Sequence, residues 1–508
     1  MALGVPPVSD QTPAGPTPTE PAPTEPRLPR RSAARTGVLT TTIATVVQIA
    51  SQIIAMAVLS RLLSPADFGS TAAPIAIATG LSLFVEYGFG ANIIQRQSDE
   101  RVFVGTAFSA VLALGVLSSA LMFLLASHIA GWLGATEVWM VQLCAPILLL
   151  LPVATFLESL RLRDLEYKSV FWSNFSSTLV GQLALPIGLA MAGAGPLALI
   201  LSQLAVHVVR IGVLLAKGGV PRPAFRPSLL REMLTFSSFF TLTRFFNFAA
   251  LQGDRVVLSS FATDTAVGFY VRAQNFSQIL ITLITASLEK VLFPLLASLK
   301  SEKARSAALY LDTLRLLGIC TGLISLGAII YSDLMIRILL GPQWMGAVPL
   351  ARIFSVMIFL RSLDKAAAML MRNEQMVKER CLLQLIYAAI TIGAAAAFGR
   401  LDLLLVAAAI VSGGALGLVY TTAMTSRYLE ISVRAAAAPV VIAVACVCAT
   451  AAIYGGLYWV LDFAGAGFEL SRAVALAAAY ALVAILVFVM RQRLLGPRIS
   501  MALFSRFR

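Results

Sequence analysis

Residues 232–296 read EMLTFSSFFTLTRFFNFAALQGDRVVLSSFATDTAVGFYVRAQNFSQILITLITASLEKVLFPLL, and this stretch decides the fold. Two long apolar runs flank a short turn at Thr263 and Asp264, which predicts a pair of membrane-spanning helices. These runs also carry charged residues, namely Arg244, Asp254, Arg255, Arg272, Glu289 and Lys290. A charge at the bilayer centre costs about 2.5–3.5 kcal/mol by insertion scales. The pair therefore predicts a polar cavity lined by protein.

The composition of the whole chain agrees with a membrane protein. Of its 508 residues, 58% are hydrophobic and 13% are charged, whereas soluble domains average about 25% charged residues. The net charge of +14 would suggest nucleic-acid binding in a soluble protein. Here the basic residues cluster between apolar runs, as cytoplasmic loops require. We expect a polytopic, all-α membrane protein with no nucleic-acid partner.

Apolar runs long enough to span a hydrocarbon core recur along the chain and predict about 14 transmembrane helices. Their approximate ranges are 38–59, 70–94, 102–127, 138–158, 169–190, 196–216, 233–259, 266–296, 306–331, 347–370, 381–399, 402–424, 435–460 and 472–490. The turns at 191–195 and 400–401 are very short. Residues 1–36 are rich in proline and have no signal-peptide core, so we expect a disordered cytoplasmic tail. Basic residues concentrate in alternate loops, which predicts that both termini lie in the cytoplasm.

Arginines dominate the intramembrane charges in the middle of the chain. Arg244 and Arg255 are eleven residues apart, so on one helix they differ by only about 20° and by roughly 16 Å of rise. Arg315 and Arg361 fall near mid-depth when counted from the loops. Arginine presents a planar fork that binds phosphate oxygens and stays charged when desolvated. The pattern indicates an anionic headgroup, although internal ion pairs such as Arg255 with Asp254 would explain part of it.

Glu86 is an intramembrane carboxylate followed by Gly88 and Gly90. Such a group serves as a proton or sodium site, or as a hydrogen-bonding group between closely packed helices. Asp254 and Glu289 are further candidates for ion coupling. Because no ATP-binding motif, no catalytic motif and no Cys or His cluster is present, we expect no enzyme activity, no cofactor and no metal site. Any energy for transport would come from a gradient, with H⁺ or Na⁺ as the coupling ion.

Two motifs, LSRLLSPADFG (59–69) and FVEYGFGANIIQR (84–96), resemble the first-loop signature and the end of the second helix of one family, the bacterial polysaccharide flippases of the Wzx type. LLGPQWMGAVPLARIF (339–354) follows a third family pattern, and we interpret its Trp344 as part of an interfacial segment. The resemblance runs over roughly residues 36–380. The family belongs to the multidrug/oligosaccharidyl-lipid/polysaccharide exporter superfamily.

This resemblance implies two six-helix bundles around a central cavity, followed by two additional helices. The corresponding segments are 1–36 for the tail, 37–216 for the first bundle, 217–232 for a cytoplasmic linker, 233–424 for the second bundle, 425–490 for the additional helices and 491–508 for a basic cytoplasmic tail. It also implies alternating access and a multi-pass protein of the bacterial inner membrane.

The implied substrate is a polyprenyl-pyrophosphate-linked oligosaccharide for exopolysaccharide or lipopolysaccharide synthesis. Arg244, Arg361 and Arg272 would hold the pyrophosphate, helped by Arg255 and Arg315. Glu86, Asp254 and Glu289 would couple an ion. Besides membrane lipids, the expected partners are a polysaccharide polymerase and the chain-length machinery.

Two other functions are consistent with parts of the sequence. An ion-coupled multidrug exporter of the same superfamily would share the fold, but such pumps favour cationic or apolar drugs, which an arginine-rich cavity disfavours. A membrane polysaccharide polymerase or ligase would be an enzyme and would need a long outside loop with catalytic side chains. All predicted outside loops are short.

Overall fold

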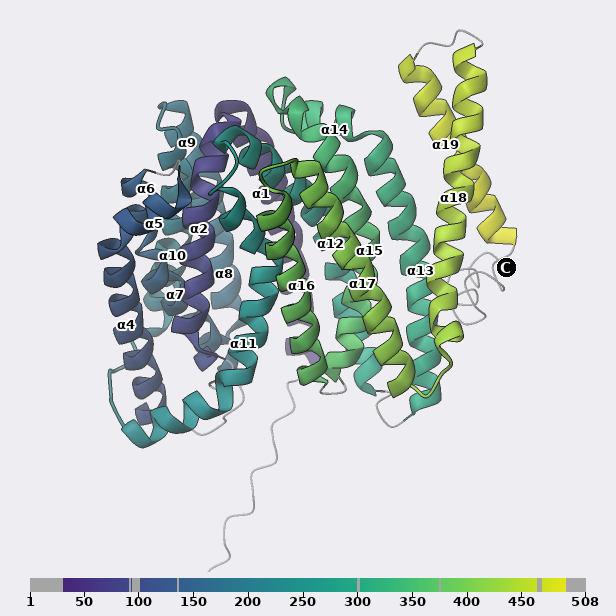
Figure 1. Ribbon diagram of the computed structural model, residues 1–508. Helices are drawn as coiled ribbons and strands as arrows, with labels where there is room; N and C mark the ends of the chain where they lie inside the picture. Colours follow the sequence, from purple (N-terminus) through teal and green to yellow (C-terminus); the bar gives the residue numbers. More distant parts are fainter. Residues whose placement is uncertain are drawn as a thin grey trace, which may run out of the picture.

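The computed structural model describes residues 31–90, 93, 101–134, 137–298, 302–373, 376–463 and 468–489, and every regular element among them is a helix (Figure 1). The first half of the chain contains α1 (Arg31–Leu62), α2 (Pro65–Glu86), α4 (Arg101–Leu124), α5 (Ala126–Leu133), α6 (Val138–Cys144), α7 (Ile147–Arg163), α8 (Tyr167–Ser177), η1 (Thr178–Ala184), α9 (Leu185–Met191) and α10 (Pro196–Gly218). The tails predicted at 1–36 and 491–508 lie, apart from 31–36, outside the described residues.

The second half contains α11 (Pro227–Leu258), α12 (Asp264–Ser298), α13 (Lys303–Ile330), α14 (Ser332–Leu339), η2 (Pro342–Ala347), α15 (Val348–Asn373), α16 (Val377–Phe398), α17 (Leu403–Tyr428), α18 (Val433–Phe463) and α19 (Phe468–Val489). Within the described part of the chain, nine helices are long and apolar enough to cross a membrane. The chain is therefore a multi-pass membrane protein. Neither α11 nor α12 is among the nine, and α11 carries three charged residues, Arg244, Asp254 and Arg255, in its second half.

The connection between α1 and α2 is shorter than the sequence motif suggested. Ser64 caps α2 by accepting a hydrogen bond from the Asp67 backbone N–H, while the Asp67 carboxylate accepts one from the Ser64 backbone N–H. Pro65 at the first helical position has no N–H to satisfy, so it also favours a helix start. Residues 65–69 therefore form the first turn of α2, so the prediction that this span begins at 70 is wrong.

Close packing in the first half brings polar side chains toward the centre of the molecule. Between α8 and α9 the chain adopts the π-helical turn η1, and Gly181 within it allows α10 to approach. A methyl group at Gly181 would lie 2.6 Å from the Val206 backbone nitrogen. The Ser202 hydroxyl donates to the Gly181 carbonyl at 2.8 Å. This contact holds Gln182 of η1 and Gln203 of α10 on the same wall of a central cavity.

The two halves of the chain meet along α1, α2, α11 and α12. Figure 1 shows α4–α10 on one side of this junction and α13–α17 on the other. We call the end that carries the α1–α2 connection the Ser64 end, and the end that carries the α10–α11 connection the Arg222 end. At the Ser64 end, the starts of α2 and α12 touch backbone to backbone at Gly69 and Gly268.

Trp344 of η2 completes the contact at the Ser64 end. Its side chain is fully buried, its ring contacts those of Phe68 and Phe269, and its Nε1 donates to the Ser60 carbonyl at 2.6 Å. The interpretation of Trp344 as an interfacial residue is therefore wrong. The tryptophan is instead the centre of an aromatic cluster that joins α1 and α2 to α12.

The last two helices pack on the outside of the second half. α18 contacts α13, and α19 contacts α18 (Figure 1). Near the start of α19, Arg472 forms a bidentate ion pair with Asp333 of α14 at 2.9 and 3.0 Å and lies over the Tyr331 ring. Arg472 also donates to the Ile330 carbonyl. One side chain therefore anchors α19 to the rest of the protein.

We expect Arg472→Gln to destabilise the docking of α19 by about 1.5–3 kcal/mol, the range for hydrogen bonds to charged groups. Hydrogen bonds from Arg472 hold the pKa of the Asp333 carboxyl below its ordinary value. The stability that the folded protein gains from this lowered pKa is present above about pH 4. It is lost as the pH falls through the lowered pKa. Thermal unfolding of the purified protein between neutral and acidic pH measures it. A variant that shows the same acid sensitivity as the wild type would contradict the assignment.

Candidate functional site

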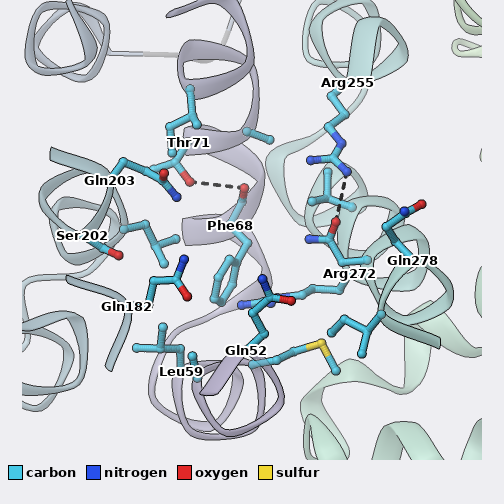
Figure 2. A pocket seen from close by; sticks show the side chains of 18 of the residues that line it. Gln52, Leu59, Phe68, Thr71, Gln182, Ser202, Gln203, Arg255, Arg272 and Gln278 are labelled. Atoms are coloured by element: carbon cyan, nitrogen blue, oxygen red, sulfur yellow. Dashed lines mark hydrogen bonds between the residues drawn. The ribbon is translucent and has the colours of Figure 1, made fainter. Parts of the chain in front are cut away.

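A cavity of about 390 Å³ lies where the two halves of the chain meet. One wall comes from α1, α2, η1 and α10, and the other comes from α11 and α12 (Figure 2). Its polar lining consists mainly of amides and two guanidinium groups, from Gln52, Gln182, Gln203, Gln252, Asn275, Gln278, Arg255 and Arg272. No carboxylate is among the described residues that line it. The cavity is thus positively charged and rich in groups that both donate and accept hydrogen bonds.

Arg255 projects from α11 and is held by neutral groups. Its guanidinium donates to the Gln274 side-chain oxygen at 2.6 and 3.0 Å and to the Asn275 side-chain oxygen at 3.0 Å. The guanidinium makes no ion pair with any residue that the structure describes. These amide oxygens fix the orientation of the cation without neutralising its charge.

Asp254 precedes Arg255 in the chain, but its carboxylate is fully buried and points elsewhere. It accepts hydrogen bonds from the Tyr270 hydroxyl, from the Gln274 side chain at 3.0 Å and from the Arg255 backbone N–H at 3.0 Å. The predicted ion pair between Arg255 and Asp254 is therefore replaced by a backbone hydrogen bond. Gln274 lies between the two charges and bonds to both.

Arg272 lies on α12 beneath the cavity, where aromatic rings hold it. Its guanidinium carbon is 3.6 Å from the centroid of the Phe68 ring and 5.8 Å from that of Trp344. The residue is 7% exposed, and its Nε has no hydrogen-bond partner among the residues that the structure describes. Cation–π contacts contribute about 0.5–2 kcal/mol, which is less than the cost of burying an unpaired charge. Among the described residues, no acid forms an ion pair with Arg272.

A second cavity of about 230 Å³ adjoins the first and shares Gln252, Arg255, Asn275 and Gln278 with it. Arg361 of α15 lines this second cavity, and its guanidinium carbon lies 4.2 Å from the Tyr387 ring centroid. Arg255 therefore lies between Arg272 on one side and Arg361 on the other. Three of the five predicted arginines border these two connected cavities.

Three other predicted site residues, Arg244, Glu86 and Arg315, have partners away from both cavities. Arg244 forms a 2.6 Å ion pair with Glu86, which joins α11 to the end of α2. Arg315 pairs with Asp312 one helical turn earlier on α13, at 3.1 Å. The side chains of Glu289 and Lys290 lie outside the described residues. On α15, which also carries Arg361, Asp364 pairs with Arg380 at 2.9 Å, and Lys365 donates to the Thr285 hydroxyl at 3.0 Å.

The Glu86–Arg244 pair makes a double-mutant cycle informative. Removal of Arg244 leaves a carboxylate whose side chain is only 5% exposed without its cation, which is costly. We expect Arg244→Gln and Glu86→Gln each to lower stability, and the double variant to recover about 1–3 kcal/mol. Denaturation of the four purified proteins measures this coupling energy. A coupling energy of zero would show that the pair is not structural.

Sequence reasoning did not identify the amides or Phe68. Gln52, Gln182, Gln203 and Gln278 are scattered over four helical elements, so no local motif connects them. These glutamines could have been identified because they lie within apolar runs. A polar side chain in a membrane-spanning segment faces the protein interior or a water-filled cavity. Phe68 lies inside a quoted motif, but its contact with Arg272 depends on the packing of α2 against α12.

The chain is similar in sequence to known polysaccharide biosynthesis proteins. The sequence model of a family described as "Polysaccharide biosynthesis protein" matches residues 58–349. The succinoglycan biosynthesis transport protein ExoT of Rhizobium meliloti is 26% identical over 58% of this chain and 59% of its own length. The lipopolysaccharide biosynthesis protein WzxC of Escherichia coli is 23% identical over 65% of this chain and 68% of its own length. The match with ExoT thus spans less than two thirds of that relative.

Solved structures share the fold. The lipid II flippase MurJ in an inward closed conformation matches 90% of this chain and 99% of its own, with a TM-score of 0.70 and 11% identity. An inward-facing multidrug resistance transporter of the MATE family matches 78% of this chain and 98% of its own, with a TM-score of 0.60 and 14% identity. At these identities the likeness concerns the fold alone.

Proposed function

The chain belongs to the polysaccharide biosynthesis protein family, and we propose from this premise that it is a flippase for a lipid-linked oligosaccharide. The substrate is a polyprenyl-pyrophosphate-linked oligosaccharide, which moves from the cytoplasmic to the outer leaflet of a bacterial inner membrane. Both termini lie in the cytoplasm, so the Ser64 end faces outward. The proposal includes the full set of 14 spans, arranged as two six-helix bundles and two additional helices.

The observation that carries this proposal is the pair of cavity arginines without an acidic partner among the described residues. Arg255 and Arg272 both line the cavity of about 390 Å³, and neither is neutralised there. A guanidinium group binds two phosphate oxygens at once through parallel N–H donors. The pyrophosphate is therefore the group that satisfies Arg255 and Arg272 together. The surrounding amides suit sugar hydroxyls, because both donate and accept hydrogen bonds.

The remaining predicted arginines differ in how readily they could contact the substrate. Arg361 borders the adjoining cavity with Arg255 and offers a further contact as the substrate moves. Arg244 and Arg315 are engaged with Glu86 and Asp312, so a phosphate would have to compete for them. Such competition links substrate binding to the release of a carboxylate. Glu86, with Asp254 and Glu289, is thereby a candidate site for H⁺ or Na⁺ coupling.

The contacts at the Ser64 end support alternating access. Backbone contact between α2 and α12, together with the aromatic cluster around Trp344, closes that end. The substrate would load from the opposite side, and opening of the Ser64 end would release it to the outer leaflet. The two cavity arginines disfavour a multidrug exporter for cationic drugs, because like charges repel.

Deletion of the gene in its host tests the function. The account expects loss of a surface polysaccharide and accumulation of its polyprenyl-pyrophosphate-linked precursor on the cytoplasmic leaflet, identified by mass spectrometry of extracted lipids. Persistence of the polymer with increased drug sensitivity would instead indicate a multidrug exporter. Accumulation of single repeat units on the outer leaflet would indicate a polymerase or ligase.

A further inference from the structure

We propose that a separate pocket at the Arg222 end binds a phosphate group. The pocket has a volume of about 750 Å³ and lies between the start of α4, the end of α7 and the α10–α11 connection. Four arginines line it, Arg101, Arg161, Arg163 and Arg222. It shares no lining residue with the two central cavities. The pocket is thus separate from the two central cavities, and its existence does not depend on the proposed function.

Close packing of the α10–α11 connection builds one wall of this pocket. A methyl group at Gly105 would lie 2.5 Å from the Arg222 carbonyl oxygen, so the connection rests directly on the first turns of α4. Arg101 and Val104 of the same turns also line the pocket. Because the first N–H groups of a helix have no partner within the helix, the start of α4 adds partial positive charge there.

Arg161 forms the inner part of the site. Although the residue is only 5% exposed, its Nε has no hydrogen-bond partner among the residues that the structure describes. Within that part of the chain, its other nitrogens make a 3.4 Å hydrogen bond to the Leu214 carbonyl and a 3.7 Å ion pair with Glu166. Gly218 lies against the guanidinium, since a methyl group there would overlap it at 1.5 Å. A buried guanidinium with an N–H group that has no acceptor is suited to bind an anion.

Among the residues that the structure describes, the charges around the pocket do not balance. Asp164 is the one acidic residue among the described lining residues, and its carboxylate already pairs with Arg163 at 3.1 Å. Arg101 and Arg222 are exposed and make no ion pair with a residue that the structure describes. The preference for basic residues in cytoplasmic loops explains why arginines occur at this end. This preference does not explain why arginines from three separate segments line the same pocket, or why one of them, Arg161, is buried.

The chemistry that fits is a phosphate group, supplied either by an anionic phospholipid or by a soluble phosphate. Basic pockets between the cytoplasmic ends of membrane helices bind phosphate headgroups. The volume lies within the range of roughly 300–1,000 Å³ that small-ligand sites occupy. Both sources present the same oxygens to the arginines, so binding experiments must distinguish them.

The test uses the purified full-length protein and the double variant Arg101→Gln/Arg222→Gln. Both side chains are exposed, so the substitutions should leave the fold intact. The matched control is Arg226→Gln/Arg427→Gln, which removes two exposed positive charges that do not line the pocket. One arm measures retention of cardiolipin from phosphatidylcholine nanodiscs by native mass spectrometry. The other arm titrates inorganic pyrophosphate in detergent without lipid, by calorimetry.

We expect binding to weaken about fivefold for each pocket arginine removed, following roughly 1 kcal/mol per basic residue near a charged surface. The control should bind like the wild type. Cardiolipin binding alone would identify a headgroup, and pyrophosphate binding that depends on Arg101 and Arg222 would identify a soluble ligand. Equal losses in the control and the pocket variant, or wild-type binding by the pocket variant, would overturn the proposal.

Discussion

Arg272→Gln is expected to lower export of the lipid-linked oligosaccharide about tenfold to a hundredfold without loss of folded protein. Hydrogen bonds to charged groups contribute about 1.5–3 kcal/mol, which corresponds to this range of rates. Stability should not fall, because the wild-type protein buries this guanidinium without an ion pair among the described residues. The substitution removes that burial cost together with the contact to Phe68. Appearance of the surface polymer, normalised to protein in the membrane, measures the effect.

Two further variants separate charge from geometry. Arg272→Lys keeps the positive charge but loses the planar fork and most of the stacking on Phe68, so we expect intermediate export. Arg337→Gln removes an exposed arginine from α14 and should export at the wild-type rate. Equal export by Arg272→Gln and Arg337→Gln would contradict the role of Arg272 in holding the pyrophosphate.

Gly268→Ala is expected to destabilise the closed state of the Ser64 end and thereby to slow transport. A methyl group at Gly268 would lie 1.9 Å from the Pro65 carbonyl oxygen, and one at Gly69 would lie 1.8 Å from the Asp264 carbonyl oxygen. Both neighbours are backbone atoms at helix starts, so neither can rotate away. Overpacking costs about 1–3 kcal/mol, which shifts the ratio of closed to open molecules about fivefold to a hundredfold.

Spin labels at Leu62 and Thr265 would report this shift, because both residues are exposed at the Ser64 end. The experiment needs a background in which the five free cysteines are replaced. Gly212→Ala is the matched control, since a methyl group there meets nothing within 4 Å. The account expects longer label separations for Gly268→Ala alone. Unchanged separations with normal transport would show that this contact does not act as a gate.

The sequence was sufficient to locate most helix ends. The break at Thr263 and Asp264 is confirmed, with α11 ending at Leu258 and α12 beginning at Asp264. The very short connections before Pro196 and Leu403 also separate helices, as predicted. These positions are marked by local residues that stop or start helices, so the pattern of apolar runs suffices. The start of α2 was misplaced because the Ser64 capping box was not recognised within the motif.

The site could be predicted only in part. Arg255, Arg272 and Arg361 were identified because arginines are costly inside a membrane and therefore conspicuous. Whether an arginine faces a cavity or an acid depends on the neighbouring helix, which periodicity along one helix does not reveal. Arg244 illustrates this limit, because its partner Glu86 is 158 residues away in the chain. Trp344 was assigned to an interface for the same reason, since its burial depends on residues distant in the chain such as Phe68 and Phe269.

Direct transport by the purified protein tests the central claim. The wild type and Arg272→Gln would be reconstituted into vesicles with a fluorescent polyprenyl-pyrophosphate-linked oligosaccharide, under imposed proton and sodium gradients. A reagent that cannot cross the membrane would then report the label on the outer leaflet. We predict that wild-type vesicles expose label that protein-free vesicles keep protected, and that Arg272→Gln vesicles expose it about tenfold to a hundredfold more slowly than the wild type. Protected label in wild-type vesicles, or equal exposure by the variant, would contradict this prediction.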